Sequence, residues 1–429
     1  MEYRKVTLPN GLRVLIGEMP ETRSVSLAVY VGVGSRIETK DDAGTSHFLE
    51  HMVFKGSAKR PTAADISQTI ESKGGVVNAS TEKEVTVFWS RVPARHYLVA
   101  LDVIADLIRA PMLRPTDVES ERNVIVEELR MYRDQPQDRV HTLVDELLYP
   151  RHPLGWEVAG REEVVLGMTA DRLRGFMERG YAPSRTVVAL AGPLRADEAI
   201  AAVDEALGGL APREVVKAKP APRAGKAHAK LVGKKAEQTN LCVGWRTVHT
   251  THPDKYSIEM LNAVLGEGMS SRLFLELREK RGLAYDVHSF RGNYSDAGHL
   301  VVYAGFAPQN GAEVLKAITR EVARLRDELV PDVEIERVRD FAKGRLELQL
   351  EGTGGVSGWL AGQELFLGRV RSVEEVTSII DGVTTADIQR VARQYLRPEL
   401  AYVAAIGPRA SLAAITPPVA DEAPVVMVS

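Results

Sequence analysis

Apolar and polar positions along the chain alternate between strand-like and helix-like spacing. Runs that are short and alternating, or short and apolar, predict strands at 13–16, 24–33 and 186–191. Apolar residues spaced three and four apart predict helices over 93–108, 117–131 and 139–148. Strands and helices are mixed along the chain, so the pattern predicts an α+β fold.

The same order of elements returns in the second half of the chain. The stretch 209–226 (GLAPREVVKAKPAPRAGK) is rich in Ala, Pro and Lys, which is typical of a linker. We therefore expect an N-terminal domain at 1–208 and a C-terminal domain at 227–429. Each should be a mixed β-sheet packed with helices, and the two should be related as an internal repeat. The glycine-rich segment 351–368 interrupts the helical pattern and predicts a helix break or a mobile segment.

Composition and charge limit the kinds of partner and the cellular location that the sequence predicts. Lys and Arg total 55 against 58 Asp and Glu, a net charge of −3 over 429 residues, which disfavours a nucleic-acid partner. The single cysteine, Cys242, lies in an apolar stretch and is expected to be a buried, inert thiol. The chain has no secretory pattern at its start and no apolar run long enough to span a membrane, so we expect a cytoplasmic protein.

The sequence HFLEH at 47–51 carries the clearest chemical signal. Thr45 or Ser46 should cap a helix here and Gly56 should end it. On that helix His47 and His51 share one face, so both imidazoles can reach one Zn²⁺, while Glu50 lies beside them as a base for a water molecule. The alternative is two ordinary histidines on an amphipathic helix.

A catalytic zinc needs a third protein ligand and an open position. The helix at 117–131 offers Glu121 and Glu128, seven residues apart and therefore on one face, and Glu127 is a competing carboxylate.

Together these motifs resemble the pitrilysin/insulinase family of inverted-motif zinc metallopeptidases. The resemblance rests on HxxEH with ERNVIVEELRMYRD, and extends through GTSHFLEHMVFKG, GGVVNASTEKEVTVFW and LGEGMSSRLFLELREKRGLAY. The chain is similar to half-size members of the processing-peptidase type. The resemblance implies that His47, His51 and Glu128 bind zinc, that Glu50 is the general base, and that Glu121 is an auxiliary catalytic glutamate.

The resemblance also implies substrate contacts in both halves. Asn78 and Ala79 match a segment that presents an edge strand to an extended peptide, and Arg278 and Tyr285 match a substrate-binding pair. For Asn78 a local turn or cap hydrogen bond is the alternative. For the Arg/Tyr pair the alternative is a solvated helix end.

These expectations add up to a zinc endopeptidase that hydrolyses unfolded peptides or presequence-like segments inside a dimeric chamber. A homodimer is expected, with a heterodimer containing a noncatalytic homologue as the alternative, because full-length relatives resemble four such domains in one chain. Two other classes stay open at this point. They are a noncatalytic scaffold subunit and a structural-zinc protein, although a structural site normally has four protein ligands.

Overall fold

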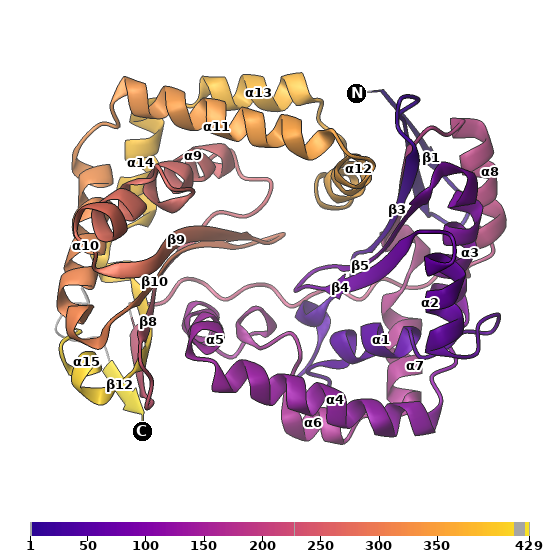
Figure 1. Ribbon diagram of the computed structural model, residues 1–429, viewed down its shortest axis with the longest axis horizontal. Coiled ribbons are helices and arrows are strands. Elements are labelled where there is room, and N and C mark those ends of the chain that lie inside the picture. The colour runs from indigo at the N-terminus through magenta and orange to yellow at the C-terminus, as the bar shows by residue number, and fades with distance from the viewer. Residues whose placement is uncertain (1, 227, 416–424, 429) are drawn as a thin grey trace. The chain divides into compact units, whose positions relative to one another are not determined.

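The computed structural model describes residues 2–226, 228–415 and 425–428, and the chain forms two compact units (Figure 1). Of the described residues, the first unit contains 2–129, 157–219 and 346–373; the second contains 130–156, 220–226, 228–345, 374–415 and 425–428. Each unit is built on a six-stranded sheet, which confirms an α+β fold with two similar domains. The contiguous division at 209–226 stays a prediction.

The sheet of the first unit has the order β1-β2-β6-β3-β5-β4, which puts β4 at one edge. Neighbouring strands are antiparallel except β2 and β6, which are parallel. The predicted strand at 13–16 lies within β2, which forms an N-terminal hairpin with β1. The strands are β1 (Tyr3–Thr7), β2 (Arg13–Glu18), β3 (Ser24–Val31), β4 (Val76–Thr81), β5 (Thr86–Pro93) and β6 (Thr186–Gly192).

Helices on one face of this sheet enclose the main core together with α4 (Pro115–Asp134) (Figure 1). Val25, Leu27, Val29 and Val31 alternate along β3 and point into that core, as the period of a strand requires. The helices are α1 (Thr45–Val53), α2 (Ala63–Glu71), α3 (Tyr97–Arg109), α7 (Ala170–Gly180) and α8 (Ala196–Leu207).

The other face is covered by helix α12 (Thr353–Leu367). The predicted helix break is present at Glu351 and Gly352, between the end of α11 (Asp332–Leu350) and the start of α12, and the glycine-rich residues that follow form a helix. Val356, Leu360 and Ala361 of α12 pack against buried residues of β2 and β6. That packing stabilises the helix against the low helix propensity of its glycines.

The sheet of the second unit has the order β12-β7-β11-β8-β10-β9, with β9 at one edge. Helix α5 (Pro136–Leu148) packs on β8 and β11 through Val140, Leu143 and Val144, and the buried Cys242 lies in the same cluster. The strands are β7 (His228–Gly233), β8 (Thr239–Thr247), β9 (Ala284–Asn293), β10 (Gly298–Phe306), β11 (Tyr402–Gly407) and β12 (Val425–Val428).

Among the remaining helices, α4 (Pro115–Asp134) contains the predicted range 117–131. Phe274–Lys280 forms a π-helix, a wider turn that is frequent at functional sites. The α-helices are α4 (Pro115–Asp134), α6 (Glu162–Leu166), α9 (Lys255–Gly266), α10 (Gly311–Asp327), α11 (Asp332–Leu350), α13 (Val373–Gly382), α14 (Thr385–Tyr395) and α15 (Arg409–Ala413).

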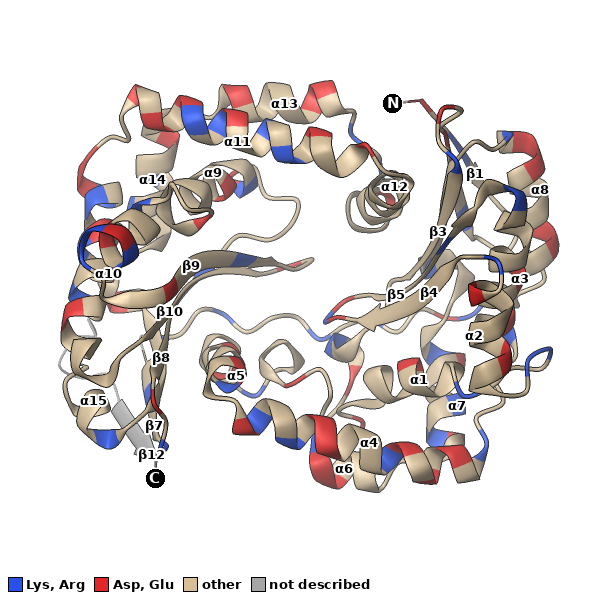
Figure 2. Cartoon of the chain, viewed as in Figure 1, with Lys and Arg blue, Asp and Glu red and all other residues tan. Residues whose placement is uncertain are grey.

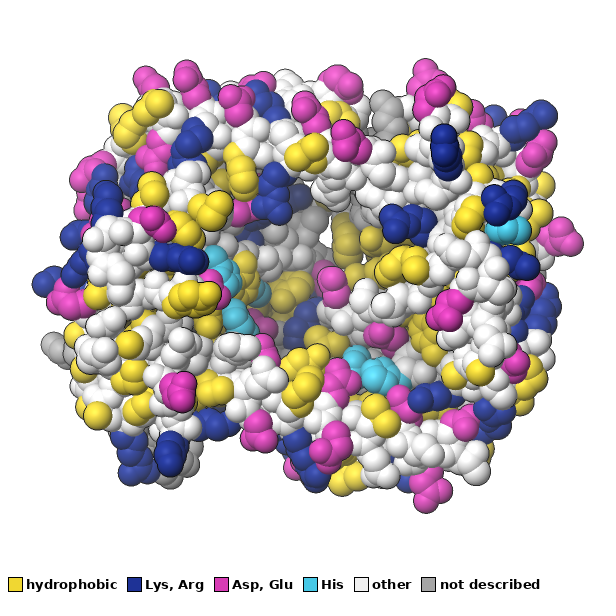
Figure 3. Space-filling model, viewed as in Figure 1, with side chains coloured by type: hydrophobic (Ala, Val, Ile, Leu, Met, Phe, Trp, Pro, Cys, Tyr) yellow, Lys and Arg dark blue, Asp and Glu magenta, His cyan; other side chains and the backbone are white. Residues whose placement is uncertain are grey.

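Charged residues of both signs are interspersed along the helices (Figure 2), and charged side chains of both signs are spread over the visible face (Figure 3). Among the described residues, none of the helices is long and apolar enough to cross a membrane.

Candidate metal centre

Helix α1 begins one residue earlier than the sequence suggests. Its N-cap is Gly44, with φ of 98°, and Thr45 and Ser46 are buried in the first turn, so the prediction that one of them is the cap is wrong. A Cβ on Gly44 would lie 2.6 Å from the Ala159 carbonyl oxygen. Only glycine combines this left-handed conformation with such a close backbone approach. The helix also ends at Val53, before Gly56.

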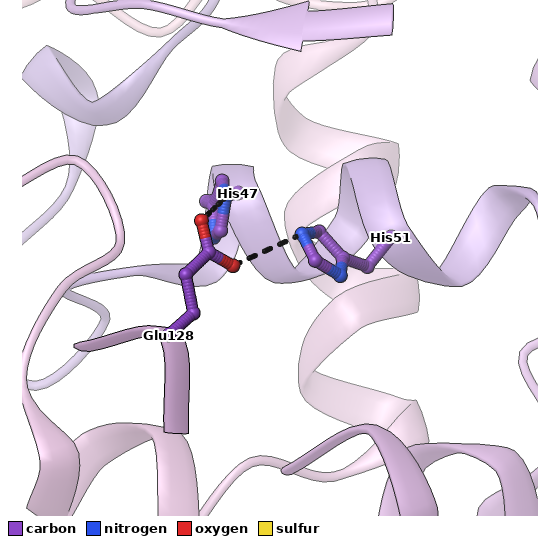
Figure 4. A group of neighbouring side chains, drawn as sticks. All are labelled: His47, His51 and Glu128. Carbon is purple, nitrogen blue, oxygen red and sulfur yellow. Dashed lines mark ion pairs between the residues drawn. The ribbon is translucent and has the colours of Figure 1, made fainter. Parts of the chain in front are cut away.

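The two histidines of α1 and Glu128 of α4 converge in the first unit (Figure 4). The rings of His47 and His51 lie 4.6 Å apart between centroids. One carboxylate oxygen of Glu128 is 3.7 Å from His47 Nε2, and the other is 3.6 Å from His51 Nε2. All three side chains are partly buried. Their neighbour Glu127 is exposed.

The spacing of these donor atoms fits a single small metal ion. Tetrahedral ligands at about 2.0–2.1 Å from zinc lie about 3.4 Å from one another. The observed separations of 3.6 and 3.7 Å are close to that value. Two imidazoles and one carboxylate are also a donor set that zinc favours, and they leave one position of a tetrahedron open.

Glu121 lies two helical turns before Glu128 on α4 and contacts the second histidine, His51. Its Oε1 lies 2.8 Å from His51 Nδ1, and its Oε2 pairs with the ammonium group of Lys55. Burial would raise the pKa of Glu121, but the contacts with His51 and Lys55 hold it below its usual value. An ionised Glu121 accepts the Nδ1 proton of His51 and so favours the tautomer that can bind a metal through Nε2. Burial lowers the pKa of His51, but the carboxylates of Glu121 and Glu128 outweigh that effect and raise it above its usual value.

Lys55 is a member of this arrangement that the sequence analysis missed. It lies four residues after His51 but beyond the end of α1, where helical spacing no longer indicates which side chains share a face. Its partner Glu121 is distant in sequence, so only the folded chain brings the two together.

Burial shifts the pKa values of His47 and Glu50 in opposite directions. Burial, helped by the charge of His51, lowers the pKa of His47 to about 4. His47 is therefore neutral at pH 7, as a metal ligand must be. Burial also raises the pKa of Glu50, although Thr81 and His51 oppose that rise. A half-buried carboxyl with a raised pKa beside the donor set is suited to accept and return a proton.

Asn78 and Ala79 lie on the edge strand β4, opposite Trp89 and Phe88 of β5. The Asn78 side chain is exposed, and its Oδ1 accepts a hydrogen bond from the Ala79 backbone amide at 2.8 Å. The local hydrogen bond considered as the alternative role is therefore present. Strand β4 ends at Thr81, close to Glu50.

Arg278 and Tyr285 come together in the second unit. The guanidinium of Arg278 lies 5.1 Å from the Tyr285 ring centroid and 5.0 Å from that of Phe274. Tyr285 is 75% exposed at the start of β9. The pair thus offers hydrogen-bond donors on an exposed surface, held together by cation–π contacts.

Comparisons with known proteins identify the family. Residues 13–162 match the family model "Insulinase (Peptidase family M16)", and residues 167–341 match "Peptidase M16 inactive domain". A protein of Streptomyces coelicolor named an uncharacterized zinc protease is 37% identical, over 93% of this chain and 89% of its own. The chain belongs to the insulinase (peptidase M16) family.

Other M16 comparisons agree along the whole length. The uncharacterized zinc protease YmxG of Bacillus subtilis is 35% identical over 95% of this chain and 99% of its own. Among solved structures, a protease from Helicobacter pylori has a TM-score of 0.90 at 23% identity, covering 95% of this chain and 99% of that one. An M16 inactive domain from Pseudomonas fluorescens has a TM-score of 0.88 at 20% identity, covering 95% and 98%. These structural likenesses show the fold.

The geometry of this M16 site predicts the effect of removing one imidazole. We expect one zinc per chain in the purified protein and an empty site in His51→Ala, because two protein ligands hold zinc far less tightly than three. Metal analysis after dialysis measures both. His96→Ala removes a histidine of the same unit outside this group and should keep the zinc. Full zinc occupancy in His51→Ala would contradict the assignment.

Proposed function

We propose that the protein is a zinc-dependent endopeptidase that hydrolyses unfolded peptides. The observation that carries this proposal is that His47, His51 and Glu128 converge while Glu50, on the same helix, stays outside the donor set. Three ligands with a separate carboxylate are what a hydrolytic metal site needs, whereas a structural zinc site is closed by a fourth protein ligand. Relatives named zinc proteases support the same activity.

In this proposal each residue has a distinct task. His47, His51 and Glu128 hold zinc, which when bound supplies Lewis-acid polarisation of the scissile carbonyl and activation of the attacking water. Glu50 takes a proton from that water and later gives it to the leaving amine. Glu121, supported by Lys55, keeps His51 in the tautomer that can bind metal through Nε2.

We place the substrate on the edge strand. An extended peptide adds to β4 through backbone hydrogen bonds, with Asn78 beside the scissile bond and Ala79 within the same strand. Binding through the backbone makes sequence preference loose, and it requires a segment that can be drawn out into a strand. Unfolded peptides and presequence-like segments meet that requirement, and folded domains do not.

A noncatalytic scaffold is the alternative suggested by the "inactive domain" model. That model matches 167–341, whereas the donor set and Glu50 lie within the 13–162 match. The inactive description therefore applies to a part of the chain that has none of these four residues, and the peptidase proposal is favoured.

Changing Glu50→Gln tests the proposed base. The amide keeps the shape of the side chain but cannot accept the proton, so turnover of a quenched peptide should fall by about 10²–10⁴-fold while zinc stays bound. Glu71→Gln makes the same change on the exposed end of α2 and should leave turnover unaltered. A zinc-loaded Glu50→Gln protein with normal turnover would remove Glu50 from the mechanism.

We further propose that the active species is a dimer enclosing a chamber in the cytoplasm. Full-length relatives resemble four domains in one chain, so two copies of this chain would supply the same number. Because both residue sets are present here, a homodimer would hold two complete sites. Each would combine the zinc set of one chain with Arg278 and Tyr285 of the other, and these two side chains would bond substrate carbonyls or a carboxylate.

Complementation tests this arrangement. His51→Ala chains and Arg278→Ala/Tyr285→Phe chains should each be weakly active alone. After exchange of subunits, a mixed dimer has one intact site, so activity should return to as much as about a quarter of the wild-type value, since half of the dimers are mixed and each holds one of two sites. Demonstrated exchange without recovery would contradict the trans arrangement. A monomeric mass for the fully active enzyme would contradict the dimer.

A further inference from the structure

The carboxyl group of Glu38 is buried at the N-terminus of the helix that carries the metal site, and no role described above uses it. Glu38 as a whole is only 5% exposed. Oε2 accepts a hydrogen bond from the Gly44 amide at 2.8 Å, and Oε1 accepts one from the Ser46 amide at 2.7 Å. Both bonds are buried.

These two bonds replace the cap that α1 lacks. The first amide groups of an α-helix have no partner within the helix, and the N-cap residue Gly44 has no side chain to offer one. Both acceptor oxygens belong to the carboxylate of Glu38, which lies six residues before Gly44 in the chain. Its negative charge also lies at the positive end of the helix dipole. Helix α1 has only nine residues, and His47 directly follows Ser46, so a shift of the first turn would reach the donor set at once.

The loop that carries Glu38 is tied to the turn that follows the edge strand β4. The Ser35 amide donates to the Glu82 carbonyl at 3.1 Å, and the Arg36 amide donates to the Lys83 carbonyl at 2.7 Å. The buried Arg36 guanidinium also pairs with Glu84 at 2.5 Å. A Cβ on Gly34 would lie 2.1 Å from the Glu82 carbonyl oxygen, so the two backbones are in direct contact.

The opposite side of the helix start is fixed by backbone packing. Gly160, with φ of 87°, lies against Ala43 and Gly44, and a Cβ on Gly160 would be 2.3 Å from the Ala43 carbonyl oxygen. Glu38 therefore provides the side-chain bonds on one side of α1, and glycine contacts close the other side. Burial raises the pKa of Glu38 to about 7, against the effect of its two amide donors, so the carboxylate is ionised in mildly alkaline solution.

We infer that Glu38 is a positioning residue for the metal site: it holds the start of α1 in register with the edge strand, and so aligns His47, Glu50 and His51 with a peptide bound on β4. The inference rests on the proposed function. It adds a residue that touches neither metal nor substrate and that acts through the backbone of Gly44 and Ser46.

The variant Glu38→Gln tests this role. An amide has one acceptor oxygen, so the glutamine loses one of the two hydrogen bonds to Gly44 and Ser46. Its NH₂ group would face the N–H group of that residue, which places two hydrogen-bond donors against each other. We expect zinc affinity, measured by competition with a chromophoric chelator, to fall by about 10–100-fold, as for other residues that support metal ligands. With saturating zinc, kcat should fall while KM changes by less than about threefold, because the substrate strand itself is unaltered.

Two further variants complete the design. Glu38→Asp keeps the charge but is one methylene shorter, so it should reach one amide and give an intermediate affinity. It also carries the test if Glu38→Gln does not fold. Glu21→Gln, an exposed glutamate of the same unit, is the matched control and should bind zinc as the wild type does. Thermal unfolding of the metal-free proteins gives the folded fraction for each.

The outcomes separate the inference from the proposed function. Folded Glu38→Gln or Glu38→Asp protein with wild-type zinc affinity and kcat would overturn the positioning role, even if its melting temperature were lower. Wild-type protein that binds no zinc would instead overturn the proposed function. Loss of affinity in Glu38→Gln, with an intermediate value for Glu38→Asp and no change for Glu21→Gln, supports the inference.

Discussion

The whole site depends on one constraint: three polar side chains from two helices must be held, partly buried, close enough for one ion to bridge them. Free imidazoles and carboxylates prefer water, and withdrawing them costs free energy unless each is paired. Here Glu128 faces both Nε2 atoms at 3.6 and 3.7 Å, and Glu121 holds His51 from behind. Helix α1 therefore has to be fixed against α4 more firmly than its nine residues could achieve alone.

Fixation comes from different sources at the two ends of α1. At the start, Glu38 and the contacts between Gly44 and the Ala159–Gly160 backbone define where the helix begins. Along its length, Phe48, Leu49 and Met52 are fully buried in the core between the helices and the sheet. Beyond its end, Lys55 pairs with Glu121 of α4. The apolar face thus anchors the helix while the polar face presents the donor set, so packing and chemistry depend on the same few turns.

Local patterns in the sequence predicted which side chains share one face of a helix, because that depends only on their spacing along the chain. The HxxEH spacing placed His47 and His51 together, and the seven-residue spacing put Glu121 and Glu128 on one face of α4. Contacts between distant residues, such as Lys55 with Glu121, leave no periodic signal, and the Glu38 cap was missed because Thr45 and Ser46 looked like ordinary caps. The glycines of 351–368 indicate the break at Glu351 and Gly352, but helix α12 after it is stabilised by the packing of Val356, Leu360 and Ala361 on the sheet, which no local pattern shows. Each compact unit consists of three segments that are separated in the sequence, and no local pattern indicates that these segments pack together.

The central claim is that zinc held by His47, His51 and Glu128 makes this chain a peptidase without a second gene product. The most direct measurement is cleavage of an internally quenched peptide by the purified protein alone, before and after treatment with a chelator and again after zinc is restored. The account predicts cleavage that the chelator abolishes and that zinc restores. Cleavage that persists in metal-free protein, or a zinc-loaded protein that cleaves no unfolded peptide, would contradict it.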